Sequence, residues 1–257
     1  ERLSSSEAGA AGRPAAFHPA TRSFAGARAA QNRAAMPFDL FPHMKQLGLP
    51  PPVGVLQVGA SYGQEMLEFV DNGIRAGVFI EPLKEPYDHL AGLCRILPRF
   101  VAVNTLCTER AGQVLDFHVA SNGGMSSSIL KPARHQDIYR RVTFPDTVRM
   151  VSSTVDDVMD FLRENGHGPV TQQLDLLYMD CQGAEFRIVQ GATRTLSQFK
   201  YIYTEVMRAN LYEGQAPFLD YCRLLEAAGF TLNDVYFGWP NHTGNALFIR
   251  HDVALLQ

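Results

Sequence analysis

A short stretch with few side chains, followed at a distance by an acidic residue, has the composition and spacing of a nucleotide- or nucleoside-binding site. The stretch contains the small residues Gly59, Ala60, Ser61 and Gly63. Backbone N–H groups are unpaired at the start of a helix, and missing side chains let a ligand approach them. Glu81 follows 22 residues after Gly59, about where a nucleotide-binding βαβ unit places the acid that binds ribose hydroxyls. Together these residues predict a cofactor site.

Other polar residues stand at the ends of apolar runs. Asp180 ends the run 174–180, Glu205 stands at the end of YIYTEV, and Asn104 follows FVAV. Because parallel strands deliver their carboxyl ends to one edge of a sheet, we expect Asp180 and Glu205 to lie on the edge that carries Gly59. Asp180 is the first candidate for general base, and Glu205 or His242 could share that task. Two roles are equally plausible for Asn104: it could contact the ligand, or it could cap a turn.

The elements that must position these residues form an alternating pattern. Apolar runs that read as strands are separated by segments with helical spacing, which predicts a doubly wound, mostly parallel sheet. The expected strands are 53–58, 76–82, 100–106, 174–180 and 201–206, and the expected helices include 64–72, 87–97 and 216–228. After Gly229 two further strands, joined by WPNHTG, predict an antiparallel hairpin at the end of the sheet.

The region between the third strand and Asp180 departs from this alternation. Residues 112–120 predict an additional strand, and the loop 121–149 is long enough to be a functional loop or a lid. Its Ser126, Ser127 and Ser128 either offer hydroxyls to a ligand or form a flexible surface turn. A strand at 149–154 is expected to run into a helix that Thr154 caps.

Composition limits the range of functions. The chain has 257 residues, of which 46% are hydrophobic, with a formal net charge of −3. Without an overall basic field, neither nucleic acid nor an anionic membrane is expected as a partner. No apolar run approaches the roughly 20 residues that span a bilayer. The four cysteines form neither a CxxC motif nor a cysteine–histidine cluster, which favours a reducing, cytoplasmic compartment.

The first 35 residues differ from the rest, because they are rich in Ala, Ser and Gly and show no apolar periodicity. We expect residues 1–35 to be disordered and residues 36–257 to form the functional domain. Two origins stay open for the segment: a leader, either organelle-targeting or vector-derived, and an upstream extension.

Several linked motifs resemble the FkbM-type S-adenosylmethionine-dependent methyltransferases. The motifs are QVGASYGQE, FIEP, SSSIL, LYMDCQGAE, YTEV and NALFIR, in that order between about Val53 and Arg250. The resemblance implies a Rossmann-like class I methyltransferase fold, with a seven-stranded sheet of order 3-2-1-4-5-7-6. It also implies O-methyl transfer to a hydroxyl of a sugar or another hydroxylated metabolite, so that a small molecule or a glycan is the acceptor.

The resemblance also assigns roles to residues. The cofactor site would contain Gln57, Gly59, Ala60, Ser61 and Gly63 at the turn, Glu81 and Pro82 at the ribose, Asn104 near the adenine and Asp180 beside the methyl group. The chain departs from the family pattern in three places, one of which spans two residues. An acid is usual where this chain has Gln57 and Asn245, and valine or isoleucine followed by glutamate is usual where it has Cys181 and Gln182.

Two other functions remain as alternatives. An NAD-dependent oxidoreductase would also use a glycine turn and a ribose-binding acid, although GASYG lacks the G-x-G-x-x-G spacing. A non-catalytic protein that has kept the fold would explain the three departures. A Mg²⁺ ion between two carboxylates is possible but not favoured, because no dedicated oxygen cage is visible. The oligomeric state is open.

Overall fold

The computed structural model describes residues 39–238 and 242–254. The expectations for residues 1–35 and for the tip of the C-terminal hairpin lie outside this part of the chain.

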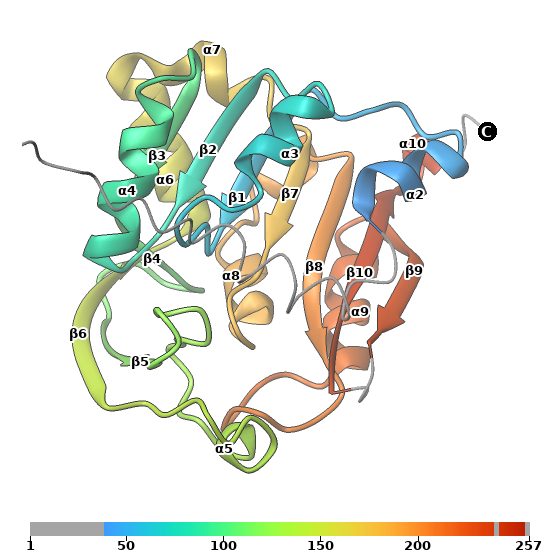
Figure 1. Ribbon diagram of the computed structural model, residues 1–257. Helices are drawn as coiled ribbons and strands as arrows, with labels where there is room; N and C mark the ends of the chain where they lie inside the picture. Colours follow the sequence, from blue (N-terminus) through green and yellow to red (C-terminus); the bar gives the residue numbers. More distant parts are fainter. Residues whose placement is uncertain (1–38, 239–241, 255–257) are drawn as a thin grey trace, which may run out of the picture. The chain divides into compact units, whose positions relative to one another are not determined.

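A seven-stranded sheet forms the centre of the described chain (Figure 1). Its strands are β1 (Gly54–Val58), β2 (Ala76–Ile80), β3 (Phe100–Val103), β7 (Leu176–Met179), β8 (Tyr201–Met207), β9 (Phe230–Phe237) and β10 (Thr243–Arg250). The spatial order is β3-β2-β1-β7-β8-β10-β9, which confirms the expected order 3-2-1-4-5-7-6. The first five strands in this order are parallel to one another, whereas β10 runs antiparallel to both β8 and β9. The carboxyl ends of β1, β2, β7 and β8 therefore share one edge.

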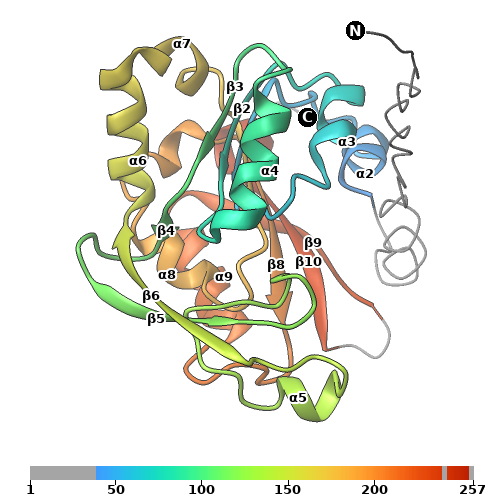
Figure 2. The same ribbon diagram turned by 60° about the vertical axis from the view of Figure 1, so that its left-hand side comes forward.

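Helices cover both faces of this sheet (Figure 2). One layer consists of α2 (Leu40–Gln46), α3 (Met66–Asp71), α4 (Lys84–Cys94) and the short α10 (His251–Ala254), and the other of α6 (Val155–Leu162), α7 (Gly168–Thr171), α8 (Glu185–Gln190) and α9 (Phe218–Ala227). Side chains along β1 point to the two faces of the sheet. Val55 packs against the first helix layer, whereas Leu56 and Val58 pack against the second. The central strands are buried on both faces, as their continuous apolar runs predict.

A smaller sheet is inserted between β3 and β7. It contains β4 (Leu106–Cys107), β5 (Val114–Val119) and β6 (Asp146–Ser153) in the order β4-β6-β5. The connection 120–145 between β5 and β6 carries the short helix α5 (His135–Ile138). Figure 1 shows this insertion on the side of the main sheet where β1 and β7 end.

Two sequence-based boundaries were wrong in this region. The single strand expected at 100–106 is broken at Asn104, because Leu106 leaves the main sheet and pairs with Ser152 of β6. The strand expected at 149–154 begins earlier, at Asp146, where it pairs with Val119. The expected cap of α6 is confirmed: Thr154 Oγ1 accepts the Asp157 N–H at 3.1 Å.

Candidate active site

The turn after β1 is built from backbone rather than side chains. Gly59 and Gly63 have φ of +80° and +75°, which glycine adopts without strain. The N–H groups of Gly59 and Ala60 both donate to the carbonyl oxygen of Ile80 at 3.0 Å. A Cβ at Gly59 would lie 2.2 Å from the carbonyl oxygen of Asp180. The glycine turn is therefore in direct contact with the end of β7.

Glu81 lies against this turn, as its spacing predicts. Its Oε2 accepts the N–H of Ser61 at 2.8 Å, and its Oε1 accepts the N–H of Leu83 at 2.8 Å. Only 5% of the residue is exposed. Burial raises the pKa of the carboxyl group to about 7, although the two backbone hydrogen bonds act in the opposite direction. A carboxyl group so placed suits the recognition of ribose hydroxyls.

Asn104 and Pro82 lie beside Glu81. The carboxamide of Asn104 donates to the carbonyl oxygens of Glu81 at 2.8 Å and Pro82 at 3.0 Å. Asn104 is exposed, so it holds the turn after β2 while it remains accessible to a ligand. The two interpretations of Asn104 are therefore compatible with each other.

Gln57 lies within β1, where 1% of it is exposed. Its Nε2 donates to Glu65 Oε2 at 3.0 Å, whereas its Oε1 is buried and has no hydrogen-bond partner among the described residues. Position 57 thus carries an amide that binds a carboxylate eight residues later.

The side chains of Asp180 and Glu205 are brought together by Gln182. Gln182 Nε2 donates to Asp180 Oδ1 at 2.7 Å and to Glu205 Oε2 at 2.8 Å. Asp180 is exposed and Glu205 partly exposed. Burial raises the pKa of Glu205 well above its ordinary value, and the nearby carboxyl groups of Asp180 and Glu185 add to this effect. The expected convergence of Asp180 and Glu205 on one edge is thus found, with an amide between them.

A third carboxyl group, that of Glu185, lies near the carboxyl groups of Asp180 and Glu205. Glu185 is 5% exposed, and its Oε1 accepts the N–H of Cys181 at 2.7 Å. Burial raises its pKa to about 7. Glu185 starts α8 and was interpreted from the sequence as an ordinary first-turn acid, but its burial exceeds what that role requires.

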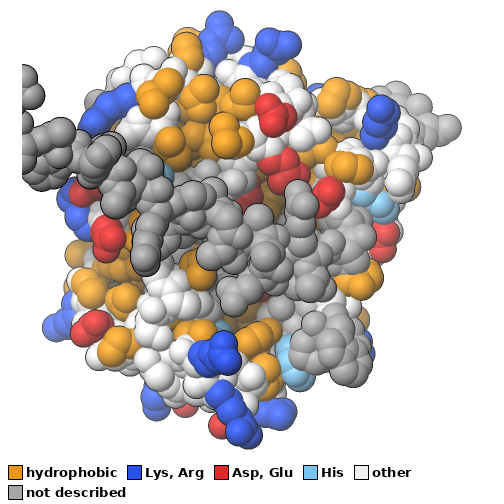
Figure 3. All heavy atoms as spheres, viewed as in Figure 1, with side chains coloured by type: hydrophobic (Ala, Val, Ile, Leu, Met, Phe, Trp, Pro, Cys, Tyr) orange, Lys and Arg blue, Asp and Glu red, His pale blue; other side chains and the backbone are white. Residues whose placement is uncertain are grey.

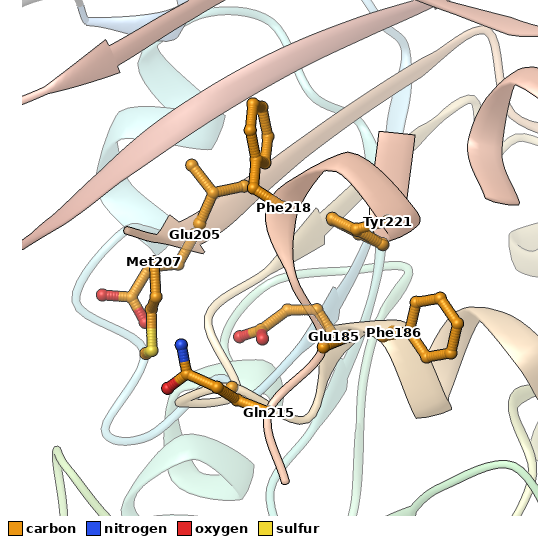
Figure 4. A pocket seen from close by; sticks show the side chains of 10 residues that line it. Glu185, Phe186, Glu205, Met207, Gln215, Phe218 and Tyr221 are labelled. Carbon is orange, nitrogen blue, oxygen red and sulfur yellow. The ribbon is translucent and has the colours of Figure 1, made fainter. Parts of the chain in front are cut away.

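A pocket opens beside Glu185 and Glu205 (Figure 4). About 320 Å³ lies between its lining atoms with open solvent included, and the enclosed part has room for about one water molecule. Its apolar and aromatic lining residues are Phe186, Val206, Met207, Phe218 and Tyr221. Figure 4 shows the carboxyl groups of Glu185 and Glu205 and the carboxamide of Gln215 around the same space. Apolar walls with a few convergent polar groups are typical of small-molecule sites.

The structure places His242 near the end of β8 and the serine cluster within the inserted loop. The carbonyl oxygen of His242 accepts the N–H of Arg208 at 3.0 Å, so its backbone lies just beyond the end of β8. No contact between its imidazole and the two carboxyl groups is found among the described residues. In the cluster, Ser127 Oγ accepts the Ala120 N–H and Ser128 Oγ donates to the Gln182 carbonyl at 2.9 Å. The buried Ser127 and Ser128 thus fix the loop rather than form a surface turn.

These residues fit S-adenosylmethionine. The turn at Gly59 has no room for a side chain, and the buried Glu81 carboxyl group is bonded to it. Within residues 39–238 and 242–254, no three His, Cys, Asp or Glu side chains form a group that could hold a metal ion. In the same part of the chain, no helix combines the length and the apolarity needed to span a membrane.

Sequence reasoning missed Gln182 and Tyr212 as site residues. Gln182 was noticed as a departure from a family pattern, but its contacts with Glu205 and Tyr212 join segments 23 and 30 residues apart. Nothing in the local pattern around Tyr212 predicts that its hydroxyl reaches the carboxyl edge.

Comparisons with known proteins agree with this geometry. Residues 57–232 match the methyltransferase FkbM domain family. The chain is 31% identical over 178 residues to the 2-O-methyltransferase NoeI of Sinorhizobium fredii (strain NBRC 101917 / NGR234), a match that covers 65% of this chain and 68% of NoeI.

Solved structures give weaker similarities. The methyltransferase FkbM structure from Methylobacillus flagellatus KT aligns with a TM-score of 0.48 and 13% identity, over 77% of this chain and 44% of that one. Magnesium protoporphyrin IX methyltransferase from Synechocystis PCC 6803 aligns with a TM-score of 0.45 and 8% identity, over 82% and 76% of the two chains. The family match covers more than half of this chain and does not favour an oxidoreductase. The chain belongs to the FkbM methyltransferase family.

Proposed function

We propose that this protein transfers a methyl group from S-adenosylmethionine to a hydroxyl oxygen of a sugar or another hydroxylated metabolite. The observation that carries the proposal is the contact between Gly59 and the backbone of Asp180. It joins the turn suited to the cofactor to the carboxyl group suited to the acceptor. The name of the relative NoeI, a 2-O-methyltransferase, supports oxygen as the methylated atom.

Different residues would perform the separate tasks of such a reaction. When bound, S-adenosylmethionine would supply an electrophilic methyl carbon, to which an aligned acceptor oxygen forms a bond as the bond to sulfur breaks. Glu81 would bind the ribose hydroxyls, Asn104 would lie near the adenine, and the turn from Gly59 to Gly63 would let the cofactor approach the backbone. Asp180 would accept the proton that the acceptor hydroxyl loses as its oxygen is methylated. Glu205, and His242 if its imidazole turns toward the edge, would assist in orienting the acceptor.

The pocket beside Glu205 is proposed as one wall of the acceptor site, because its enclosed space is too small for a whole sugar ring. Its aromatic and aliphatic wall suits the apolar face of a sugar or a similar ring, and the carboxyl groups of Glu185 and Glu205 suit its hydroxyls. Figure 3 shows Lys and Arg side chains gathered at the end of the molecule that carries α5. The exposed cations there are Lys131, Arg134, Arg140 and Arg141.

We propose no magnesium requirement, because one amide already supplies hydrogen bonds to both Asp180 and Glu205.

Cytoplasmic localisation also stays a proposal. The free thiols of Cys94, Cys107, Cys181 and Cys222 support a reducing compartment.

Calorimetric titration with S-adenosylhomocysteine tests the cofactor half of the proposal. We expect binding to the parent protein, and a loss of about tenfold to a hundredfold in Glu81→Ala, because hydrogen bonds to a charged group contribute about 1.5–3 kcal/mol. Asp180→Asn should bind normally but lose methyl transfer to a panel of methyl glycosides. Glu226→Ala, at an exposed acid on α9, controls for the loss of one negative charge. A parent protein that does not bind the nucleoside overturns the function.

A further inference from the structure

Gln57, within β1, contains a buried polar atom that packing alone does not explain. Its Oε1 has no hydrogen-bond partner among the described residues, whereas its Nε2 donates to Glu65 Oε2 at 3.0 Å. A buried acceptor without a partner costs free energy, so it needs a reason in a folded protein. The amide nevertheless turns its N–H toward Glu65, which is the orientation that suits a carboxylate acceptor. Gln57 therefore contributes a donor that holds the Glu65 carboxylate.

Glu65 does not serve as an ordinary helix-start acid. It is the N-cap residue of α3, two residues after Gly63 of the turn, but its side chain makes no capping hydrogen bond. The side chain instead points back to β1, where it meets Gln57. Glu65 is partly exposed, so its side chain is accessible from solvent. A carboxylate is thus held beside the glycine turn without a role in starting the helix.

The strand order shows on which side of the turn Glu65 lies. β1 has β2 on one side and β7 on the other, and Gln57 is paired with Tyr178 of β7 (Figure 1). Burial raises the pKa of Tyr178 well above its ordinary value, and the carboxyl groups of Glu65 and Asp180 both add to this effect. The two acids are therefore close to the same tyrosine. Glu65 thus acts on the β7 side of the turn, whereas Glu81 follows β2 on the other side.

The cofactor of the proposed function has three parts that this edge must place. S-adenosylmethionine carries a nucleoside, a sulfonium centre and an amino acid end with one ammonium and one carboxylate group. With its ribose at Glu81 and its methyl group at Asp180, the molecule would cross the end of β1 over Gly59. Its amino acid end would then lie on the β7 side of the turn. There the carboxylate of Glu65 attracts the ammonium group and repels the carboxylate of the ligand.

We propose that Glu65 binds the α-ammonium group of S-adenosylmethionine, and that Gln57 is the positioning residue that holds the Glu65 carboxylate beside the turn. This inference rests on the proposed function, because it names a further residue for the same cofactor. It does not depend on the identity of the acceptor or on the methyl-transfer step. The site should therefore bind a nucleoside with an α-amino group more tightly than the same nucleoside without it.

Calorimetric titration with three nucleosides tests the inference without an acceptor. S-adenosylhomocysteine carries the whole amino acid end, its deamino analogue lacks only the amine, and methylthioadenosine lacks the entire end. In Glu65→Gln the affinity for S-adenosylhomocysteine should fall by about tenfold to a hundredfold, because a hydrogen bond between charged groups is lost. The affinity for methylthioadenosine should stay within about twofold of the parent, and that for the deamino analogue should not fall.

Two further variants separate this role from a general effect of charge or folding. Asp71→Asn removes an exposed acid from the end of α3 and should leave all three affinities unchanged. Gln57→Leu keeps the Glu65 carboxylate but removes its donor. Its affinity for S-adenosylhomocysteine should fall by a smaller factor than in Glu65→Gln, with no change for methylthioadenosine. Gln57→Leu also serves as the second variant if Glu65→Gln does not fold.

Two results would overturn the inference. One is an unchanged affinity of Glu65→Gln for S-adenosylhomocysteine, and the other is an equal loss of affinity for all three nucleosides, which indicates a general defect of the turn. Absence of S-adenosylhomocysteine binding by the parent would instead refute the proposed function, so the two failures are distinguishable.

Discussion

At the residue scale, the carboxyl group of Glu81 links cofactor binding to pH. Its pKa in the folded protein is raised to about 7 from an ordinary 4.5. Between these values the folded protein holds a proton that the unfolded chain has lost, so stability without ligand should fall as pH rises from 4.5 to about 7. Ligand binding should change in the other direction, because the ionised carboxylate accepts hydroxyl hydrogen bonds more strongly.

We therefore predict that affinity for S-adenosylhomocysteine rises as pH increases through about 7. Calorimetry between pH of about 5.5 and about 8.5 measures the change, which for one protonation is at most about tenfold per pH unit. Glu81→Gln keeps the shape and removes the titration, so its affinity should be nearly independent of pH. An equally steep dependence in Glu81→Gln would assign the titration to another group.

At the scale of elements, the turn between β1 and α3 has no space for a side chain. We predict that Gly59→Ala abolishes measurable cofactor binding, because its Cβ would lie 2.2 Å from the Asp180 carbonyl oxygen and push the two strand ends apart. Gly73→Ala is the matched control. Gly73 also has a positive φ, +90°, but a Cβ there meets nothing within 4 Å. It should cost about 1 kcal/mol of stability and leave binding intact.

Calorimetry on both variants, with urea unfolding for stability, checks this prediction. If Gly59→Ala bound the nucleoside as the parent does, the turn would have to relax without disturbing Asp180. The proposed contact between the two halves of the site would then lose its support.

Features that depend on local sequence were predicted correctly, whereas features that depend on pairing between distant segments were not. The strands β1, β2, β7 and β8, the cap at Thr154 and the position of Glu81 depend on local apolar runs and short spacings, and these were predicted. The break at Asn104 was not, because it arises from pairing between Leu106 and Ser152, which no local pattern reports. The contacts of Gln182 were missed for the same reason, since its partners Glu205 and Tyr212 come from later segments.

At the scale of the whole molecule, the two faces of the sheet carry separate apolar clusters, and α2 belongs to only one of them. Its Leu40, Phe41 and Met44 are buried with Val55 of β1 and with Leu247 of β10. Phe41 packs edge-on against Phe69 of α3, and His43 Nε2 lies 3.3 Å from Asp234 Oδ2 on β9. The helix thus joins the first strand to the C-terminal hairpin.

From this arrangement we predict that Met44→Ala lowers the free energy of unfolding of the entire domain by about 2–5 kcal/mol, the usual range for a buried methionine. Met44 is 2% exposed, whereas its neighbour Lys45 is exposed, so Lys45→Ala should change stability by no more than about 0.5 kcal/mol. Urea unfolding followed by circular dichroism should give one cooperative transition with a lower midpoint. An unchanged main transition, preceded by a small early loss of helix, would mean that α2 detaches alone. The cluster it covers would then be stable without it.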